Sequence, residues 1–171
     1  TMDISADLEE LAQTNVAVVS AGAKSILDLA LTLEYLETKG VPVIGYQSKT
    51  LPAFFSRDSD FEVNFKIDTP KEIAQLIKTK YDLNLKGGVL IANPIPKAYS
   101  MPKELIDNAI NDALKEMDNL GIKGKEATPY LLGKIVELTE GKSLASNIQL
   151  VFNNCLLAAQ ISTELKQLGD A

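Results

Sequence analysis

The sequence predicts an α/β fold built on a largely parallel or mixed sheet. Short apolar segments rich in β-branched residues alternate with longer segments in which apolar residues recur at helical spacing. Residues 16–46 give a strand, a helix and a second strand, a βαβ unit whose strands are parallel and joined by a right-handed crossover. Three consecutive helical segments follow residue 102. We therefore expect a sheet in the first hundred residues and a helical carboxyl-terminal region.

Residues 1–60 contain two predicted helices and two predicted strands. Ser5 is a suitable N-cap for a helix over residues 6–13, whose first turns are acidic. Residues 16–20 read as a buried strand. A largely apolar helix is expected over residues 25–39, and Gly40 can end it. Residues 42–46 form the next strand. Residues 47–60 form a polar and aromatic loop, and loops at the carboxyl ends of parallel strands commonly carry ligand contacts.

The next element is a helix from Thr69-Pro70 to about residue 81, since Pro is favoured at the first helical position. Residues 89–92 form another buried strand. It ends at residues 93–96, where two prolines cannot continue a central strand.

Three helices complete the chain. The first covers residues 103–120, the second starts with Thr128 as its cap and ends near residue 141, and the third starts at Ser143. Asn147 and Asn154 lie on nearly the same side of the third helix. Its apolar stripe is expected to face the core, with Cys155 as a core thiol, and comprises Leu144, Ile148, Val151, Cys155 and Ala159.

Composition excludes several classes of protein. The formal charge of −6 argues against a nucleic-acid scaffold, which would present a basic surface. The single cysteine forbids an internal disulfide and favours a reducing compartment, the cytoplasm. No apolar run approaches the length of a membrane span, and no signal peptide is visible. The absence of histidine removes His-based triads and His metal sites, so any chemistry must use Lys, Asp, Glu, Tyr, Cys or a metal held by oxygen ligands.

A single lysine, Lys24, follows the first predicted strand and a small-residue turn. The polarised amino end of a helix disfavours an ammonium group, and a neutral amine can attack a carbonyl or sugar carbon to form a Schiff base. The alternative is a surface lysine just inside a helix. A phosphate-binding P-loop is excluded, because the two positions that require Gly hold Ala23 and Val18.

These segments together resemble the pseudouridine-5'-phosphate glycosidase family, also called the indigoidine-synthase-A-like family. The resemblance covers essentially the whole chain. The segments that carry it are Asp3-Ile4-Ser5-Ala6-Asp7-Leu8, Val18-Val19-Ser20-Ala21-Gly22-Ala23-Lys24-Ser25-Ile26-Leu27-Asp28, Glu34-Tyr35-Leu36-Glu37-Thr38, Gly40-Val41-Pro42-Val43-Ile44-Gly45-Tyr46, Leu51-Pro52-Ala53-Phe54-Phe55, Ala92-Asn93-Pro94-Ile95-Pro96, and Ser146-Asn147-Ile148-Gln149-Leu150-Val151-Phe152-Asn153-Asn154.

The resemblance implies a three-layer α/β/α fold and an enzyme that cleaves the C–C glycosidic bond of pseudouridine 5'-phosphate, giving uracil and ribose 5-phosphate. It implies Lys24 as the nucleophile and Asp3 as a ligand of a divalent cation, usually Mn²⁺. It also implies substrate contacts from Ser5, Ala6, Asp7 and Asn147, and a homotrimer. Each residue also has a plainer interpretation: the carboxylates and Ser5 can cap or charge a helix, and Asn147 can simply be solvated.

Members of the family are about twice as long as this chain, and Thr1 preceding Met2 indicates a fragment or a processed chain. We expect residues 1–171 to form a single α/β domain, the carboxyl-terminal half of a longer enzyme. The resemblance puts the general-acid glutamate and a second substrate-binding lysine in the amino-terminal half, which a separate chain could supply. Two alternatives are open: a noncatalytic binding or assembly fragment, and a relative that forms C-glycosides.

Overall fold

The computed structural model describes residues 5–23, 28–123 and 126–169, and its centre is a parallel sheet. The four strands are short and lie in the order β1-β4-β2-β3, with every adjacent pair parallel. Their bounds are β1 Ala17–Ser20, β2 Val43–Tyr46, β3 Phe65–Ile67 and β4 Val89–Ala92. The predicted α/β class is confirmed. The strands of the predicted βαβ unit are parallel, but β4 lies between them.

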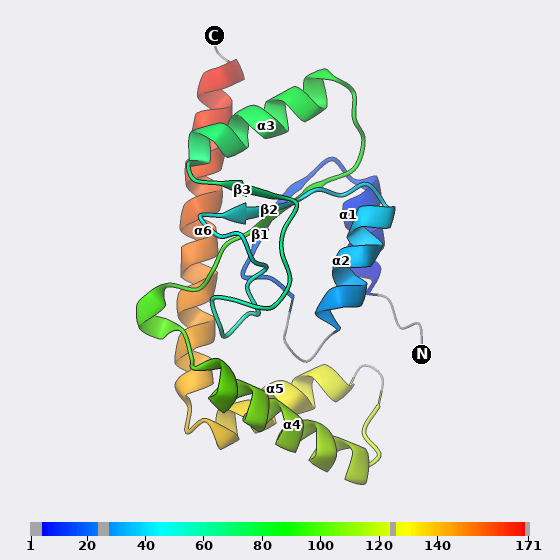
Figure 1. The fold of residues 1–171 in the computed structure, drawn as a ribbon, viewed down its shortest axis with the longest axis vertical. Coiled ribbons are helices and arrows are strands. Elements are labelled where there is room, and N and C mark those ends of the chain that lie inside the picture. The colour runs from blue at the N-terminus through cyan, green and yellow to red at the C-terminus, as the bar shows by residue number, and fades with distance from the viewer. Residues whose placement is uncertain (1–4, 24–27, 124–125, 170–171) are drawn as a thin grey trace.

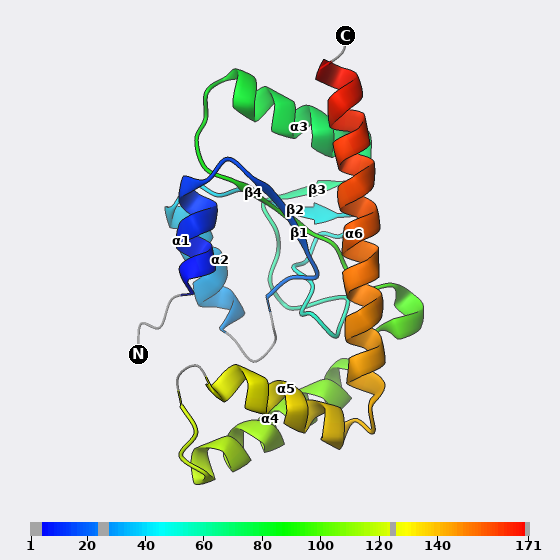
Figure 2. The same cartoon turned by 180° about the vertical axis from the view of Figure 1, so that it is seen from behind.

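Helices cover both faces of the sheet (Figures 1 and 2), so the arrangement has three layers. On one face lie α1 (Ala6–Gln13) and α2 (Leu29–Thr38), and on the other α3 (Pro70–Asp82) and α6 (Lys142–Gly169). Each face has its own buried apolar cluster, since parallel strands in this setting are buried from both sides. The buried members are Ile44, Ile73, Ala74, Ile77, Val89, Ile91, Leu157 and Ile161 on the α3/α6 face, and Leu11, Leu36, Val41, Val43, Leu51 and Ala92 on the other.

Two further helices, α4 (Lys103–Asn119) and α5 (Ala127–Leu138), pack on each other at one end of the molecule. A short 3-10 helix, η1 (Lys97–Tyr99), precedes them. The buried faces of α4 and α5 form a separate core with Phe55 from the loop after β2 and Met101 from the segment before α4. The loop is thereby fixed at the junction between the sheet and this helical pair.

Several predicted boundaries agree with the structure. Ser5 caps α1, its hydroxyl accepting from the N–H of Asp7 at 3.3 Å, and the helix covers the predicted residues. Thr69 caps α3 in the same way through the N–H of Glu72. The strand predicted over residues 89–92 is β4.

Other predictions about elements were wrong. Strand β3 was not expected. The helix predicted from residue 25 begins as α2 at Leu29, because Asp28 has extended backbone angles and its carboxylate accepts from the N–H of Leu31 at 3.0 Å. Thr128 lies inside α5 rather than at its cap.

The predicted core stripe of α6 was also wrong. All five of its residues are exposed, and Cys155 is an exposed thiol, not a core one. The helix packs inward through a different face, where Leu150, Leu157 and Ile161 are buried.

Candidate active site

The carboxyl ends of the parallel strands meet at one edge of the sheet, where α/β proteins commonly bind ligands. Strand β1 ends at Ser20, and the turn Ala21-Gly22-Ala23 follows it. The neighbouring strand β4 ends at Ala92, and the N–H of Asn93 donates to the carbonyl of Ser20 at 2.7 Å. The segment that leads to Lys24 therefore leaves the sheet directly beside Asn93.

Gly22 in this turn has a conformation that suits only glycine. Its φ is +84°, and a Cβ built there would lie 1.7 Å from the carbonyl oxygen of Pro52. The loop after β2 thus packs directly on the turn after β1, and the N–H of Phe54 donates to the carbonyl of Ala21 at 3.0 Å. Backbone contact this close fixes the path of the chain up to Ala23.

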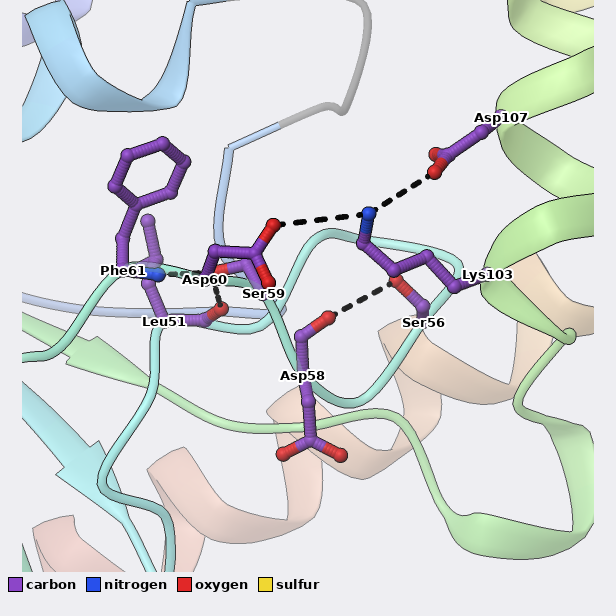
Figure 3. A network of polar contacts seen from close by, with 8 residues as sticks. All are labelled: Leu51, Ser56, Asp58, Ser59, Asp60, Phe61, Lys103 and Asp107. Carbon is purple, nitrogen blue, oxygen red and sulfur yellow. Dashed lines mark hydrogen bonds and ion pairs between the residues drawn. The ribbon is translucent and has the colours of Figure 1, made fainter.

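The loop of residues 47–60 is held by its own polar contacts and by α4 (Figure 3). The hydroxyl of Ser59 donates to the carbonyl of Leu51 at 2.6 Å. The ammonium of Lys103, at the start of α4, lies 3.8 Å from a carboxylate oxygen of Asp60 and 3.1 Å from one of Asp107. In Figure 3 this ammonium lies between the two carboxylates and so connects the loop to α4.

Helix α6 brings its asparagines to the same edge of the sheet. Asn93 is buried, and its side-chain amide donates to the side-chain oxygen of Asn154 at 3.0 Å. Asn153 donates to the carbonyl of Pro94 at 3.2 Å. One turn earlier, Leu150 packs in a small core with Ala21 and Ile95. These contacts seat α6 against the ends of β1 and β4.

Asn147 lies one turn before Leu150 on α6 and is half-buried. The hydroxyl of its neighbour Ser146 donates to the carbonyl of Tyr99 at 2.7 Å, which anchors this turn of the helix. Asn147 is therefore on the turn of α6 next to the segment that packs on Ala21.

Ser5, Ala6 and Asp7 form the amino end of α1 and are exposed. The other end of this helix lies at the start of β4, because the N–H of Gly88 donates to the carbonyl of Leu11 at 2.7 Å. The helix runs back from there beside α2, and in Figures 1 and 2 its amino end lies near the amino end of α2, the helix that follows β1.

Ion pairing holds α1 on α2 in this position. The ammonium of Lys39 lies 3.0 Å from a carboxylate oxygen of Glu9, and the hydroxyl of Tyr35 donates to the same carboxylate. The hydrogen bond from Tyr35, together with Lys39, lowers the pKa of Glu9 below its usual value. The pKa values of Tyr35 and Lys39 are raised, in each case mainly by the hydrogen bond with Glu9.

Two predicted site residues, Asp3 and Lys24, lie outside the described residues. Within those residues, no three His, Cys, Asp or Glu side chains gather as metal ligands would. None of the described helices combines the length and hydropathy that a membrane span requires.

Sequence reasoning assigned no site role to Asn93 and Asn154. Asn93 could have been noticed as the first polar residue after a central strand. Its pairing with Asn154 could not, since the two are far apart in sequence. Arg57, one of several basic residues whose charge would suit a phosphate, uses one guanidinium nitrogen to donate to the carbonyl of Ile95.

A groove of about 920 Å³ lies away from this edge, near the amino ends of β2 and β3. Its apolar lining includes Phe65, Leu76, Leu83 and Leu85, and none of the predicted site residues that the structure describes borders it. Because ligands of open α/β sheets bind at the carboxyl ends of the strands, a groove at the opposite edge is a poor candidate for the active site.

Comparison with known proteins gives consistent matches over the whole chain. The sequence model described as "Indigoidine synthase A like protein" matches residues 1–164. Curated proteins named pseudouridine-5'-phosphate glycosidase are 63% identical over 95% of the chain in Hahella chejuensis, 58% identical over 99% in Clostridium botulinum and 57% identical over 99% in Escherichia coli. The chain spans 54–55% of the length of these relatives.

Solved structures agree with the sequence matches. A crystal structure of the prealnumycin C-glycosynthase AlnA in complex with ribulose 5-phosphate superposes with a TM-score of 0.91 at 35% identity, covering 99% of this chain and 56% of that one. An indigoidine synthase A-like protein from Thermotoga maritima superposes with a TM-score of 0.86 at 36% identity, covering 96% of this chain and 55% of that one.

Proposed function

The chain belongs to the indigoidine synthase A-like family, and from this membership we propose that it forms part of a pseudouridine-5'-phosphate glycosidase. The observation that carries the proposal is the identity of 57–63% to curated glycosidases of that name over 95–99% of the chain. The proposed substrate is pseudouridine 5'-phosphate, and the proposed products are uracil and ribose 5-phosphate.

A lysine nucleophile suits this reaction. A C–C glycoside has no leaving oxygen to protonate, so the two-carboxylate mechanism of ordinary glycosidases does not apply. The amine of Lys24 would instead add at C1' as the sugar ring opens. The C–C bond then breaks with its electrons on uracil, which takes up a proton, and the nitrogen lone pair stabilises the resulting iminium. Water hydrolyses the iminium to ribose 5-phosphate and restores the amine.

The described residues support a binding role around this lysine. The amino end of α1, with Ser5, Ala6 and Asp7, carries the partial positive charge of a helix N-terminus, which favours an anion such as the phosphate, although the N–H of Asp7 is already bonded to the Ser5 hydroxyl. Asn147, half-buried on α6, would hydrogen-bond the base or the sugar. The turn at Gly22, fixed by Pro52, would hold the lysine segment between them.

We also propose Asp3 as a ligand of Mn²⁺ or another divalent cation. A site with one protein carboxylate is chemically reasonable, because hard divalent cations take oxygen ligands and often keep several waters. The bound cation would supply positive charge for substrate oxygens. A homotrimer, a separate chain that supplies the general acid, and a cytoplasmic location complete the proposal.

A second candidate is synthesis of a C-glycoside from a sugar phosphate. The structural similarity to the prealnumycin C-glycosynthase favours it, but at 35% identity rather than 57–63%. Fold similarity alone does not determine the direction of the reaction.

The test is uracil release from pseudouridine 5'-phosphate by the chain co-expressed with the remaining part of a relative's sequence. Borohydride reduction in the presence of ribose 5-phosphate should add the sugar to Lys24, identified by peptide mass analysis. Lys24→Met should abolish both signals, whereas the matched control Lys49→Met should keep them. Uracil release that persists in Lys24→Met would refute the proposed nucleophile, and no release with the complete set of parts would favour the glycosynthase.

A further inference from the structure

Helix α6 is apolar on two opposite faces. Its inner face, Leu150, Leu157 and Ile161, is buried against the sheet and α3. We define its outer face as five large apolar side chains, each about half to two-thirds exposed: Leu144, Ile148, Val151, Phe152 and Leu156. On an ideal helix, at about 100° per residue, Ile148 lies about 180° from Leu157.

The outer face also lacks charge. From residue 143 to residue 163 the helix has no Asp, Glu, Lys or Arg. The exposed side of α3, in contrast, carries Lys71, Glu72 and Asp82. Helices that are apolar all round lie inside a large protein or a membrane, and α6 does not meet the criteria for a membrane span. Its composition is that of a helix buried on both sides.

A second exposed feature is the edge strand β1. Its Ala17 and Val19 pack toward the inner face of α6, whereas Val18, which points to the other side of the strand, is 36% exposed. Figure 2 shows the two elements on the same side of the molecule. An edge strand leaves backbone groups available for further pairing or covering.

We propose that the outer face of α6 docks the part of the family's polypeptide that this chain does not span. The relatives' chains are almost twice as long as the match, so nearly half of each must pack somewhere on this fold. The outer face from Leu144 to Leu156 is about 18 Å long and one helix wide, roughly 200 Å² in projection. A stable interface needs about 800 Å² from each partner. The face is therefore one part of a larger contact, as a covering half-protein provides, rather than a sufficient contact between two copies.

This inference rests on family membership and not on the proposed reaction, so its test measures binding. The tagged chain is co-expressed with the part of the Hahella chejuensis relative outside the match, and the co-purified partner is quantified. Ile148→Asp/Phe152→Asp should reduce the retained partner at least tenfold. The matched control Leu105→Asp/Leu120→Asp, at positions 44% and 60% exposed on and just after α4, should retain it as the original chain does.

Circular dichroism of each chain checks that its helices persist, and Ile148→Ser/Phe152→Ser repeats the test if the aspartates disturb folding. Equal retention by the original chain and the folded variants would overturn the proposal, as would no retention by the original chain. If an outer-face substitution dissociates a homo-oligomer and leaves partner retention unchanged, the face binds a second copy of this chain instead. Retention without uracil release would contradict only the proposed function.

Discussion

Replacing Gly22 by alanine tests whether the turn before Lys24 depends on close backbone packing. Two effects add at this position. A φ of +84° strains any L-residue, by about 1 kcal/mol for alanine. The new methyl would also lie 1.7 Å from the carbonyl oxygen of Pro52, so the loop must move, and overpacking of this kind costs about 1–3 kcal/mol. We expect Gly22→Ala to lower the free energy of unfolding by about 2–4 kcal/mol.

Gly40 is the matched control, because its φ is +69° and an added Cβ would meet nothing within 4 Å. Gly40→Ala should therefore lower the free energy of unfolding by only about 1 kcal/mol. Urea unfolding followed by circular dichroism measures both. Equal losses for the two variants would refute the steric argument, because the contact with Pro52 would then contribute nothing. Uracil release by the assembled protein should fall further in Gly22→Ala than in Gly40→Ala.

Three other substitutions test single contacts. The ammonium of Lys80 donates to three successive carbonyls before β4 at 2.7–2.8 Å, so Lys80→Met should lower the free energy of unfolding by about 2–3 kcal/mol in urea. Asn154→Leu leaves the buried amide of Asn93 unpaired and should lower the free energy of unfolding by about 1–3 kcal/mol. An unchanged free energy of unfolding would show that water replaces the hydrogen bond. The hydrogen bond from Lys134 lowers the pKa of Glu116 in the folded state. The unfolded chain therefore binds the proton first as the pH falls, and stability from this pair should be lost below pH 4.5. Across that range the free energy of unfolding should depend less steeply on pH in Glu116→Gln than in the original chain. An unchanged dependence on pH would contradict the assignment.

Local chemistry in the sequence predicted the elements with clear end signals. Ser5 and Thr69 are capping residues placed directly before helical patterns, and both cap as expected. The two prolines after Asn93 likewise mark the end of β4. Strand β3 has only three residues, two of them exposed, so no periodic pattern could reveal it.

Tertiary context decided the features that the sequence did not predict. Helix α6 carries two apolar stripes, and periodicity cannot say which of them faces the sheet. The structure buries the stripe of Leu150 and Leu157, which leaves Ile148 and Cys155 exposed. Likewise, the pairing of Asn93 with Asn154 depends on how α6 crosses β4 and has no signal in either segment.

The start of α2 changes the physical basis for a reactive lysine. The helix dipole acts within the first turn, and α2 begins only at Leu29, after the Asp28 cap. A lowered pKa of Lys24 therefore cannot be argued from a position inside this helix. Burial and neighbouring cations are the other causes that favour a neutral amine, and the part of the family's polypeptide that this chain does not span would provide burial if it also covers the turn after β1. We expect the apparent pKa of Lys24, measured from the pH dependence of its acetylation by peptide mass analysis, to be lower in the assembled protein than in this chain alone. Equal pKa values of Lys24 in the two states would mean that covering the site does not activate the nucleophile.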